Sequence, residues 1–132
     1  MSGIFLENKK TFYSVLMDAK EALDKKNGKK QKISKIYKKA YVSKQVFSSI
    51  FNGVIPQKDT VFKLAFALES SLEEAEEILK YAGYSFGNCI KRDLILKSCF
   101  EKGIIDILEI NELLKRENEK LLLREIKSQK YL

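Results

Sequence analysis

The fold of this chain is decided by the stretch Ile33-Ser-Lys-Ile-Tyr-Lys-Lys-Ala-Tyr-Val-Ser-Lys-Gln-Val-Phe-Ser-Ser-Ile-Phe-Asn-Gly53. Apolar residues recur three and four positions apart on both sides of a short bend, which predicts two helices at about 33–40 and 43–52. Ser43 can cap the second helix through its hydroxyl, and Asn52-Gly53 can end it in a left-handed conformation. Both apolar faces must meet a third element, so we expect the two helices to cross steeply.

Two short crossed helices predict a helix-turn-helix, which presents the start of its second helix to the major groove of DNA. Polar side chains of suitable length for base edges or phosphates stand at that start: Ser43, Lys44, Gln45, Ser48 and Ser49. A helical hairpin that only builds an all-α core, with its polar face in water, has the same pattern. The pattern alone leaves both interpretations open.

The residues that follow the bend favour the first interpretation. They are Ile50-Phe51-Asn52-Gly53, then Pro56, Lys58 and Thr60, then Leu64-Ala65 and Ala67-Leu68, then Ser71-Leu72-Glu73-Glu74. In this order and spacing, the chain resembles the Cro/C1-type (XRE-like) helix-turn-helix family over roughly residues 12–83. The resemblance implies a five-helix lambda-repressor-like bundle that binds DNA. The segment Ala82-Gly83-Tyr84 is similar to a subgroup of small bacterial proteins in which further helices follow.

The resemblance also implies roles for single residues. Lys44 and Gln45 match the paired base-reading positions, and Ser49 matches a later base-reading or phosphate position. Asn52 and Lys58 match positions that contact phosphates after the recognition helix. With the lysines just before and within the first motif helix, the expected phosphate contacts are Asn52, Lys58, Lys32 and Lys35.

Three positions depart from the family pattern. Ile33 or Ser34 stands where many members have a phosphate-binding Gln, and Tyr37 stands where a small residue is usual. Tyr41 replaces the turn glycine, and a tyrosine resists the positive φ that glycine adopts there. These departures bear on how the motif docks on DNA more than on the fold.

The formal charge of +7 is spread unevenly along the chain. Residues 1–60 hold 13 Lys and 5 acidic residues, whereas residues 61–132 hold 12 Lys or Arg and 13 acidic residues. The excess positive charge lies in the half that carries the motif, which predicts a polyanionic partner. A lysine-rich composition can also reflect an A/T-rich genome, but that origin explains the number of lysines and not their asymmetry.

Composition argues against several other classes of protein. The chain has no run of about eighteen apolar residues and no signal-peptide pattern at its N-terminus, so we expect a cytoplasmic protein with no membrane partner. Cys89 and Cys99, without any histidine, do not make a metal pattern. The usual acid–base and nucleophile groupings are missing, so we expect no enzyme, no catalytic residue, no cofactor and no small-molecule ligand.

The whole chain is expected to be all-α, because strong helix formers dominate and no stretch alternates as a strand does. Residues 1–10 would form an N-terminal arm, 11–84 the DNA-binding domain, and 85–132 an extension of two or three helices. Helices are expected at about 11–25, 57–69, 71–83 and 89–102, and from 105 or 106 to 117. The helix expected at 71–83 should begin with a capping box formed by Ser71 and Glu74.

The extension is a candidate for dimerisation. Its apolar residues Ile107, Ile110, Leu114 and Leu121 approximate a heptad pattern, although packing against the first helix or the helix at 89–102 explains them equally well. We favour a homodimer because a single motif reads few bases.

The leading functional hypothesis is a sequence-specific, repressor-like transcription regulator that binds double-stranded DNA. The alternative is a protein–protein adaptor or antitoxin-like component of a phage-defence or toxin assembly. Exposure of Tyr41 beside an apolar patch would favour the alternative.

Overall fold

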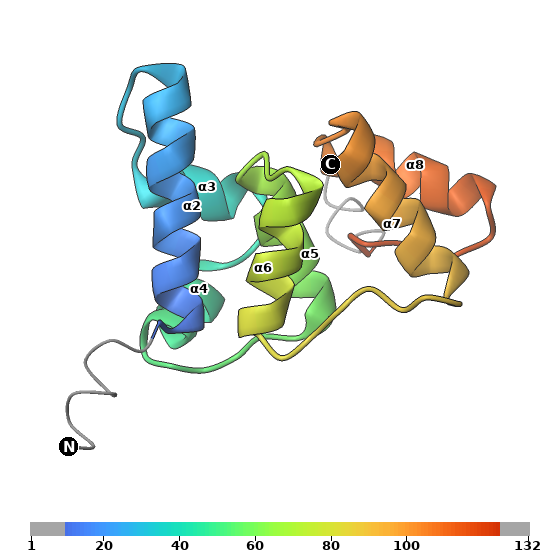
Figure 1. Ribbon diagram of the computed structural model, residues 1–132, viewed down its shortest axis with the longest axis horizontal. Coiled ribbons are helices and arrows are strands. Elements are labelled where there is room, and N and C mark those ends of the chain that lie inside the picture. The colour runs from blue at the N-terminus through green and yellow to red at the C-terminus, as the bar shows by residue number, and fades with distance from the viewer. Residues whose placement is uncertain (1–9, 125–132) are drawn as a thin grey trace, which may run out of the picture.

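Seven α-helices and no strand make up residues 10–124, the part of the chain that the computed structural model describes (Figure 1). The all-α prediction is confirmed, whereas the narrower lambda-repressor-like arrangement stays a prediction. None of these helices is long and apolar enough to cross a membrane. Most of the expected N-terminal arm, and the chain from residue 125 onward, lie outside the described residues. The helices are α2 (Phe12–Asn27), α3 (Ile33–Lys39), α4 (Lys44–Phe51), α5 (Lys58–Ala67), α6 (Leu72–Tyr81), α7 (Lys91–Lys102) and α8 (Ile107–Arg116).

Local signals in the sequence set where these helices begin. The Ser71 hydroxyl accepts a hydrogen bond from the backbone N–H of Glu74 at 3.2 Å, and the Glu74 carboxylate accepts one from the N–H of Ser71 at 2.7 Å. This reciprocal pair is the expected capping box at the start of α6. The Ser43 hydroxyl caps α4 in the same way by accepting from the N–H of Val46 at 3.1 Å. Both predicted caps are therefore confirmed.

The helix ends share a single backbone motif. At the end of α3, the N–H of Val42 bonds the carbonyl of Tyr37 at 2.9 Å, and the N–H of Tyr41 bonds that of Lys38 at 3.0 Å. This pair of bonds is the Schellman motif, which needs a left-handed residue just past the helix. The same pair recurs after every helix in residues 10–124, and the left-handed residues are Gly28, Tyr41, Gly53, Glu69, Gly83, Gly103 and Asn118. Two of these seven residues, Tyr41 and Glu69, have side chains that disfavour the left-handed backbone conformation.

Helix α5 lies at the centre of the molecule. Its side chains are buried around nearly the whole circumference: Val61, Phe62, Leu64, Ala65, Phe66 and Ala67. It packs against α3, α6 and α8, and α6 in turn packs against α2 and α7. In Figure 1, α5 and α6 stand between α2–α4 on one side and α7–α8 on the other. A helix that is apolar all round is stable only when covered in this way.

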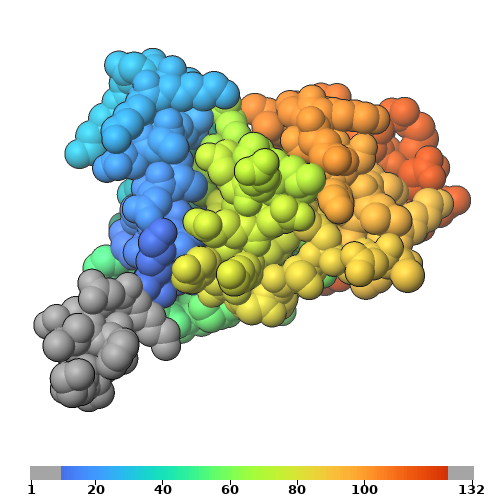
Figure 2. Space-filling model, viewed as in Figure 1, coloured from blue at the N-terminus to red at the C-terminus, as the bar shows by residue number. Residues whose placement is uncertain are grey.

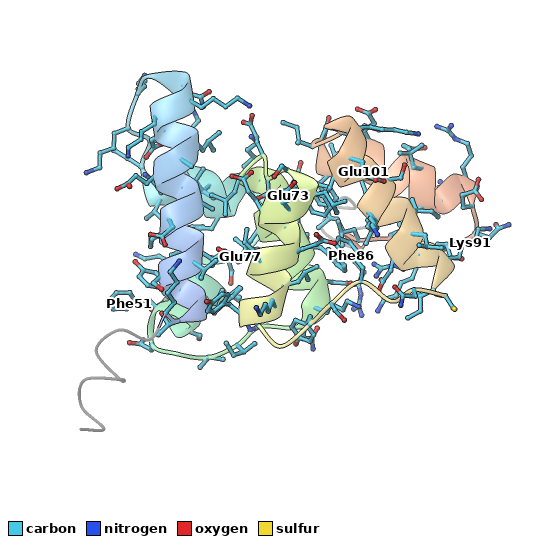
Figure 3. The ribbon with its side chains drawn as sticks, viewed as in Figure 1. Phe51, Glu73, Glu77, Phe86, Lys91 and Glu101 are labelled. Atoms are coloured by element: carbon cyan, nitrogen blue, oxygen red, sulfur yellow. The ribbon has the colours of Figure 1, made fainter. Side chains whose placement is uncertain are left out.

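Aromatic rings join α7 to α5. The rings of Phe66 and Phe100 stack almost parallel, with centroids 3.9 Å apart. Phe86, from the segment between α6 and α7, lies 5.6 Å from Phe62 and 6.1 Å from Phe100. Figure 3 shows Phe86 between α6 and α7. Helices α6 and α7 are in direct contact, as the space-filling view in Figure 2 shows.

Two crossed ion pairs fasten the start of α7 to the start of α5. The Lys58 ammonium donates to the Asp93 carboxylate at 2.8 Å, and Arg92 binds both oxygens of Asp59 at 2.8 and 3.0 Å. Asp93 is buried and also accepts from the N–H of Gly87 at 2.7 Å. The expected boundary between residues 84 and 85 is therefore crossed by both apolar and charged contacts.

The heptad interpretation of the extension is wrong. Ile107, Ile110 and Leu114 are buried in the chain's own core, where α8 packs against α7 and α5. Helix α8 ends at Arg116, so Leu121 lies beyond it. The same spacing of three and four residues arises from any helix that buries one face, which is why the pattern fitted a coiled coil. The equal alternative, packing against the helix at 89–102, is confirmed.

Replacing Asp93 by Ala should lower the free energy of unfolding by about 2–3 kcal/mol, because Lys58 and the N–H of Gly87 lose a buried charged acceptor. Urea denaturation followed by circular dichroism measures the change. The matched control is Glu117→Ala, which breaks the exposed Lys91–Glu117 pair and should cost less than about 1 kcal/mol. Equal effects of the two substitutions would contradict the anchoring role of Asp93.

Tyr41→Gly should be more stable than Tyr41→Ala by about 1 kcal/mol, because only glycine adopts φ 57 without steric cost. Both substitutions remove the tyrosine ring, so their difference isolates the backbone. Lys38 is an exposed residue inside α3, where the difference in stability between the Gly and Ala variants should have the opposite sign. Lys38→Gly should be less stable than Lys38→Ala by about 1 kcal/mol. Thermal unfolding of the four variants tests both signs.

Candidate nucleic-acid interface

One face of α4 is fixed to α2 and α3. Phe47 is buried, and its ring stacks on Tyr37 with centroids 5.3 Å apart and lies 6.2 Å from the ring of Tyr13. Ile50, one turn further, is also buried. Tyr37, which stands where the Cro/C1-type family usually has a small residue, therefore supplies part of the surface that holds α4. Because the apolar face is fixed in this way, the opposite face of α4 is left in water.

The side chains predicted to contact bases divide into two groups. Lys44, Gln45 and Ser48 are exposed, and their side chains form no hydrogen bond or ion pair within residues 10–124. The Ser43 hydroxyl is occupied by its cap bond, although the residue is exposed. Ser49 is half-buried and donates its hydroxyl to the carbonyl of Gln45 at 3.1 Å. The first group is therefore free to bind an external partner.

The predicted phosphate contacts divide similarly. Lys32 and Lys35 are exposed and have no ion-pair partner in the described part of the chain. Asn52 is exposed, and its amide donates to the carbonyl of Ser48 at 3.1 Å, which leaves its side-chain oxygen open. Lys58 is half-buried and already bound to Asp93. The Lys58 ammonium therefore holds α7 in place, and a phosphate could bind this ammonium only by competing with the Asp93 carboxylate.

Positive charge around α3 and α4 is largely uncompensated. Residues 25–58 contain ten lysines and no acidic residue. Lys39 pairs with Glu69 and Lys25 with Glu21. The exposed lysines without an ion-pair partner in residues 10–124 include Lys29, Lys32, Lys35, Lys38 and Lys44. Such a surface attracts a polyanion, because each neutralised phosphate releases condensed counterions.

Asp24 was not among the predicted site residues, yet it anchors the lysine-rich loop before α3. Its carboxylate accepts from the Lys20 ammonium at 2.6 Å and from the backbone N–H of Gln31 at 3.1 Å. The hydrogen bond from Lys20 is the largest cause that lowers the pKa of Asp24 below its ordinary value, which burial opposes. The Lys20–Asp24 spacing of four residues was a visible signal, whereas the bond to Gln31 depends on the path of the loop.

Exposed apolar side chains flank the polar face of α4. Tyr41 is 47% exposed and Phe51 is 62% exposed, and Val46, Val54 and Ile55 are exposed as well. The ring of Phe51 meets that of Tyr13 edge-on at 5.1 Å, near the start of α2 (Figure 3). This is the observation that favours a protein partner, because exposed apolar groups beside one another mark interaction sites. The surface around α4 therefore combines basic and apolar parts.

The described residues hold no group of three or more His, Cys, Asp or Glu side chains that could bind a metal ion. Cys89 is exposed, and Cys99 is buried in α7, where burial is the largest cause that raises the pKa of its thiol. A raised pKa makes a thiol less reactive, because the thiolate is the nucleophile.

Comparison of the chain with family models, with curated proteins and with solved structures found no match. The resemblance to the Cro/C1-type family therefore rests on the quoted residues alone.

Proposed function

We propose that this chain is a sequence-specific, repressor-like transcription regulator of the cytoplasm that binds double-stranded DNA through a helix-turn-helix formed by α3 and α4. One observation carries the proposal: the free polar face of α4 belongs to a segment, residues 25–58, that holds ten lysines and no acidic residue. A recognition helix needs both properties, since phosphate contacts position the protein and base contacts specify the sequence.

Each free side chain of α4 suits a role in the major groove. The Gln45 amide can bind adenine with two hydrogen bonds, and the Lys44 ammonium can bind guanine or a phosphate. Ser48, one turn later, can reach a base edge or a phosphate by a shorter bond. Lys32, Lys35 and Asn52 are proposed to hold the DNA backbone. Lys58 is left out of this set because it is bound to Asp93.

A second candidate is a protein–protein adaptor or antitoxin-like component. It is favoured by the exposed apolar side chains at both ends of α4, of which Phe51 is the most exposed. A protein partner would cover Phe51, Val54 and Ile55 and would need acidic residues to meet the nearby lysines. Substitution of Phe51 by Ser should then abolish capture of that partner.

Gln45→Ala should cost about 1–3 kcal/mol of binding free energy on a preferred site and little on random DNA, because a base contact carries the sequence information. The preferred site is obtained by selecting bound duplexes from a random pool, and affinities follow from titration with labelled DNA. An equal loss on every sequence would contradict direct reading by Gln45. A flat titration of the wild-type chain at low salt would exclude DNA binding and leave the adaptor.

Lys32→Ala and Lys35→Ala should weaken binding to all sequences. Each should also lower the slope of log affinity against log salt by about 0.9 for every phosphate that the variant no longer neutralises. The matched control is Lys80→Ala, an exposed lysine on α6, which should leave the slope unchanged. Lys58→Ala should also leave the slope unchanged while lowering stability. A slope that falls with Lys58→Ala would return this residue to the phosphate contacts.

A further inference from the structure

The packing of α8 on α7 leaves a groove between the two helices. Its volume of about 400 Å³ falls within the range of about 300–1,000 Å³ that small-molecule sites occupy. Helices α7 and α8 lie on the opposite side of α5 and α6 from α4 (Figure 1). Figure 3 shows Lys91, one of the lining residues, at the start of α7. The groove is therefore separate from the proposed DNA surface.

Much of the lining of the groove is apolar. Ile95, Ile104 and Leu113 are half-buried and pack against the core, and the buried Cys99 is also part of the lining. Leu94 adds an exposed apolar side chain. Because these side chains share one concave surface, an apolar ligand would remove several of them from water at once.

Positive charge stands at both ends of this lining. Lys91 comes from the start of α7 and Arg116 from the end of α8, whereas Lys102 comes from the end of α7. Glu117 is the acidic residue of the lining, and Lys91 pairs with it at 3.1 Å. The side chains of Lys102 and Arg116 are exposed and have no ion-pair partner within residues 10–124. Both cations are therefore available to a ligand.

A basic residue in the last turn of a helix is favourable without any ligand, because it faces the negative end of the helix dipole. That effect accounts for Lys102 and for Arg116 one by one. It does not account for the concave apolar surface between them. An apolar groove with a few charged groups at its ends is typical of a site for a small amphiphilic molecule, and the unpaired cations call for an anion.

The dimensions of the groove set the size of this anion. Ile95 and Lys102 are seven residues apart on α7, about 10 Å along the helix axis, which is the length of an extended acyl chain of about eight carbons. The Arg116 guanidinium can bind a carboxylate through two parallel hydrogen bonds, which an ammonium group cannot do. Arg116 is therefore the better partner for the charged end of the ligand.

We propose that the groove between α7 and α8 binds a free medium-chain monocarboxylate, with its carboxylate on Arg116 and its acyl chain on Ile95, Ile104 and Leu113. No motif in the sequence signals this site, because the groove exists only where two helices pack against each other. For that reason we expected no small-molecule ligand from the sequence. Ligand binding here does not depend on the proposed function, so it can be tested without DNA.

Isothermal titration of the full chain with octanoate should show one saturable site with a Kd of about 100 µM or tighter. 1-Octanol lacks the charge and butyrate lacks most of the acyl chain, so each should bind at least about fivefold more weakly. In NMR spectra, octanoate should shift the backbone amide signals of α7 and α8 and leave those of α4 in place.

Arg116→Gln should weaken octanoate binding at least about fivefold and leave 1-octanol binding unchanged, because it removes only the charged contact. The matched control is Lys102→Gln, at the other end of the groove, which should change the affinity less than about twofold. Phe51→Ser, in the exposed apolar surface beside α4, should have no effect. Circular dichroism verifies that the three variants are folded.

Absence of saturable octanoate binding up to about 1 mM, or equal affinities for octanoate and 1-octanol, would overturn the proposal. Equal losses with Phe51→Ser and Arg116→Gln would also overturn it, because the ligand would then not be confined to the groove. An affinity that falls as the protein concentration rises would assign the groove to a second copy of the chain instead. A chain that binds octanoate as expected but does not bind DNA would overturn the proposed function and support this site.

Discussion

The burial of α5 is the constraint on which the rest of the structure depends. A helix with almost no polar face cannot rest on one neighbour, so elements must gather on more than one side of it. Helix α3 meets one side and α8 another, with α6 between the two ends of the molecule. The motif helices and the C-terminal helices therefore share one core, and a change in that core reaches both.

Charge is used differently at the two ends of this core. At the start of α5, Lys58 and Asp59 are matched by Asp93 and Arg92, so four charges are neutralised within the chain. Around α3 and α4 most lysines have no such match in residues 10–124. Uncompensated like charges repel one another, so they lower the stability of the chain when no partner is bound. The unpaired lysines around α3 and α4 therefore agree with the polyanionic partner that is proposed above.

Much of the fold could be predicted because its signals are local. Ser43, Ser71 and the glycines at positions 28, 53, 83 and 103 set helix ends through neighbouring backbone atoms. Tyr41 and Glu69 occupy the same left-handed position against their own preference, so conformational propensity alone does not predict these two helix ends. The pairing of Lys58 with Asp93 joins residues 35 positions apart, so no local spacing could predict it. At the candidate site, the sequence predicted which side chains α4 presents and that the Ser43 hydroxyl caps the helix, but not that Ser49 and Lys58 already have partners.

The basic and apolar parts of the α4 surface are compatible with a single partner, and salt distinguishes the kind of partner. DNA would meet the lysines with phosphates and the apolar side chains with thymine methyl groups and sugars. An acidic protein could also meet both, but its charges are too sparse to hold condensed counterions. Counterion release belongs to the polyelectrolyte, so a DNA complex weakens as a steep power of salt concentration. A protein complex on the same lysines weakens only by screening, and its apolar contacts persist at high salt.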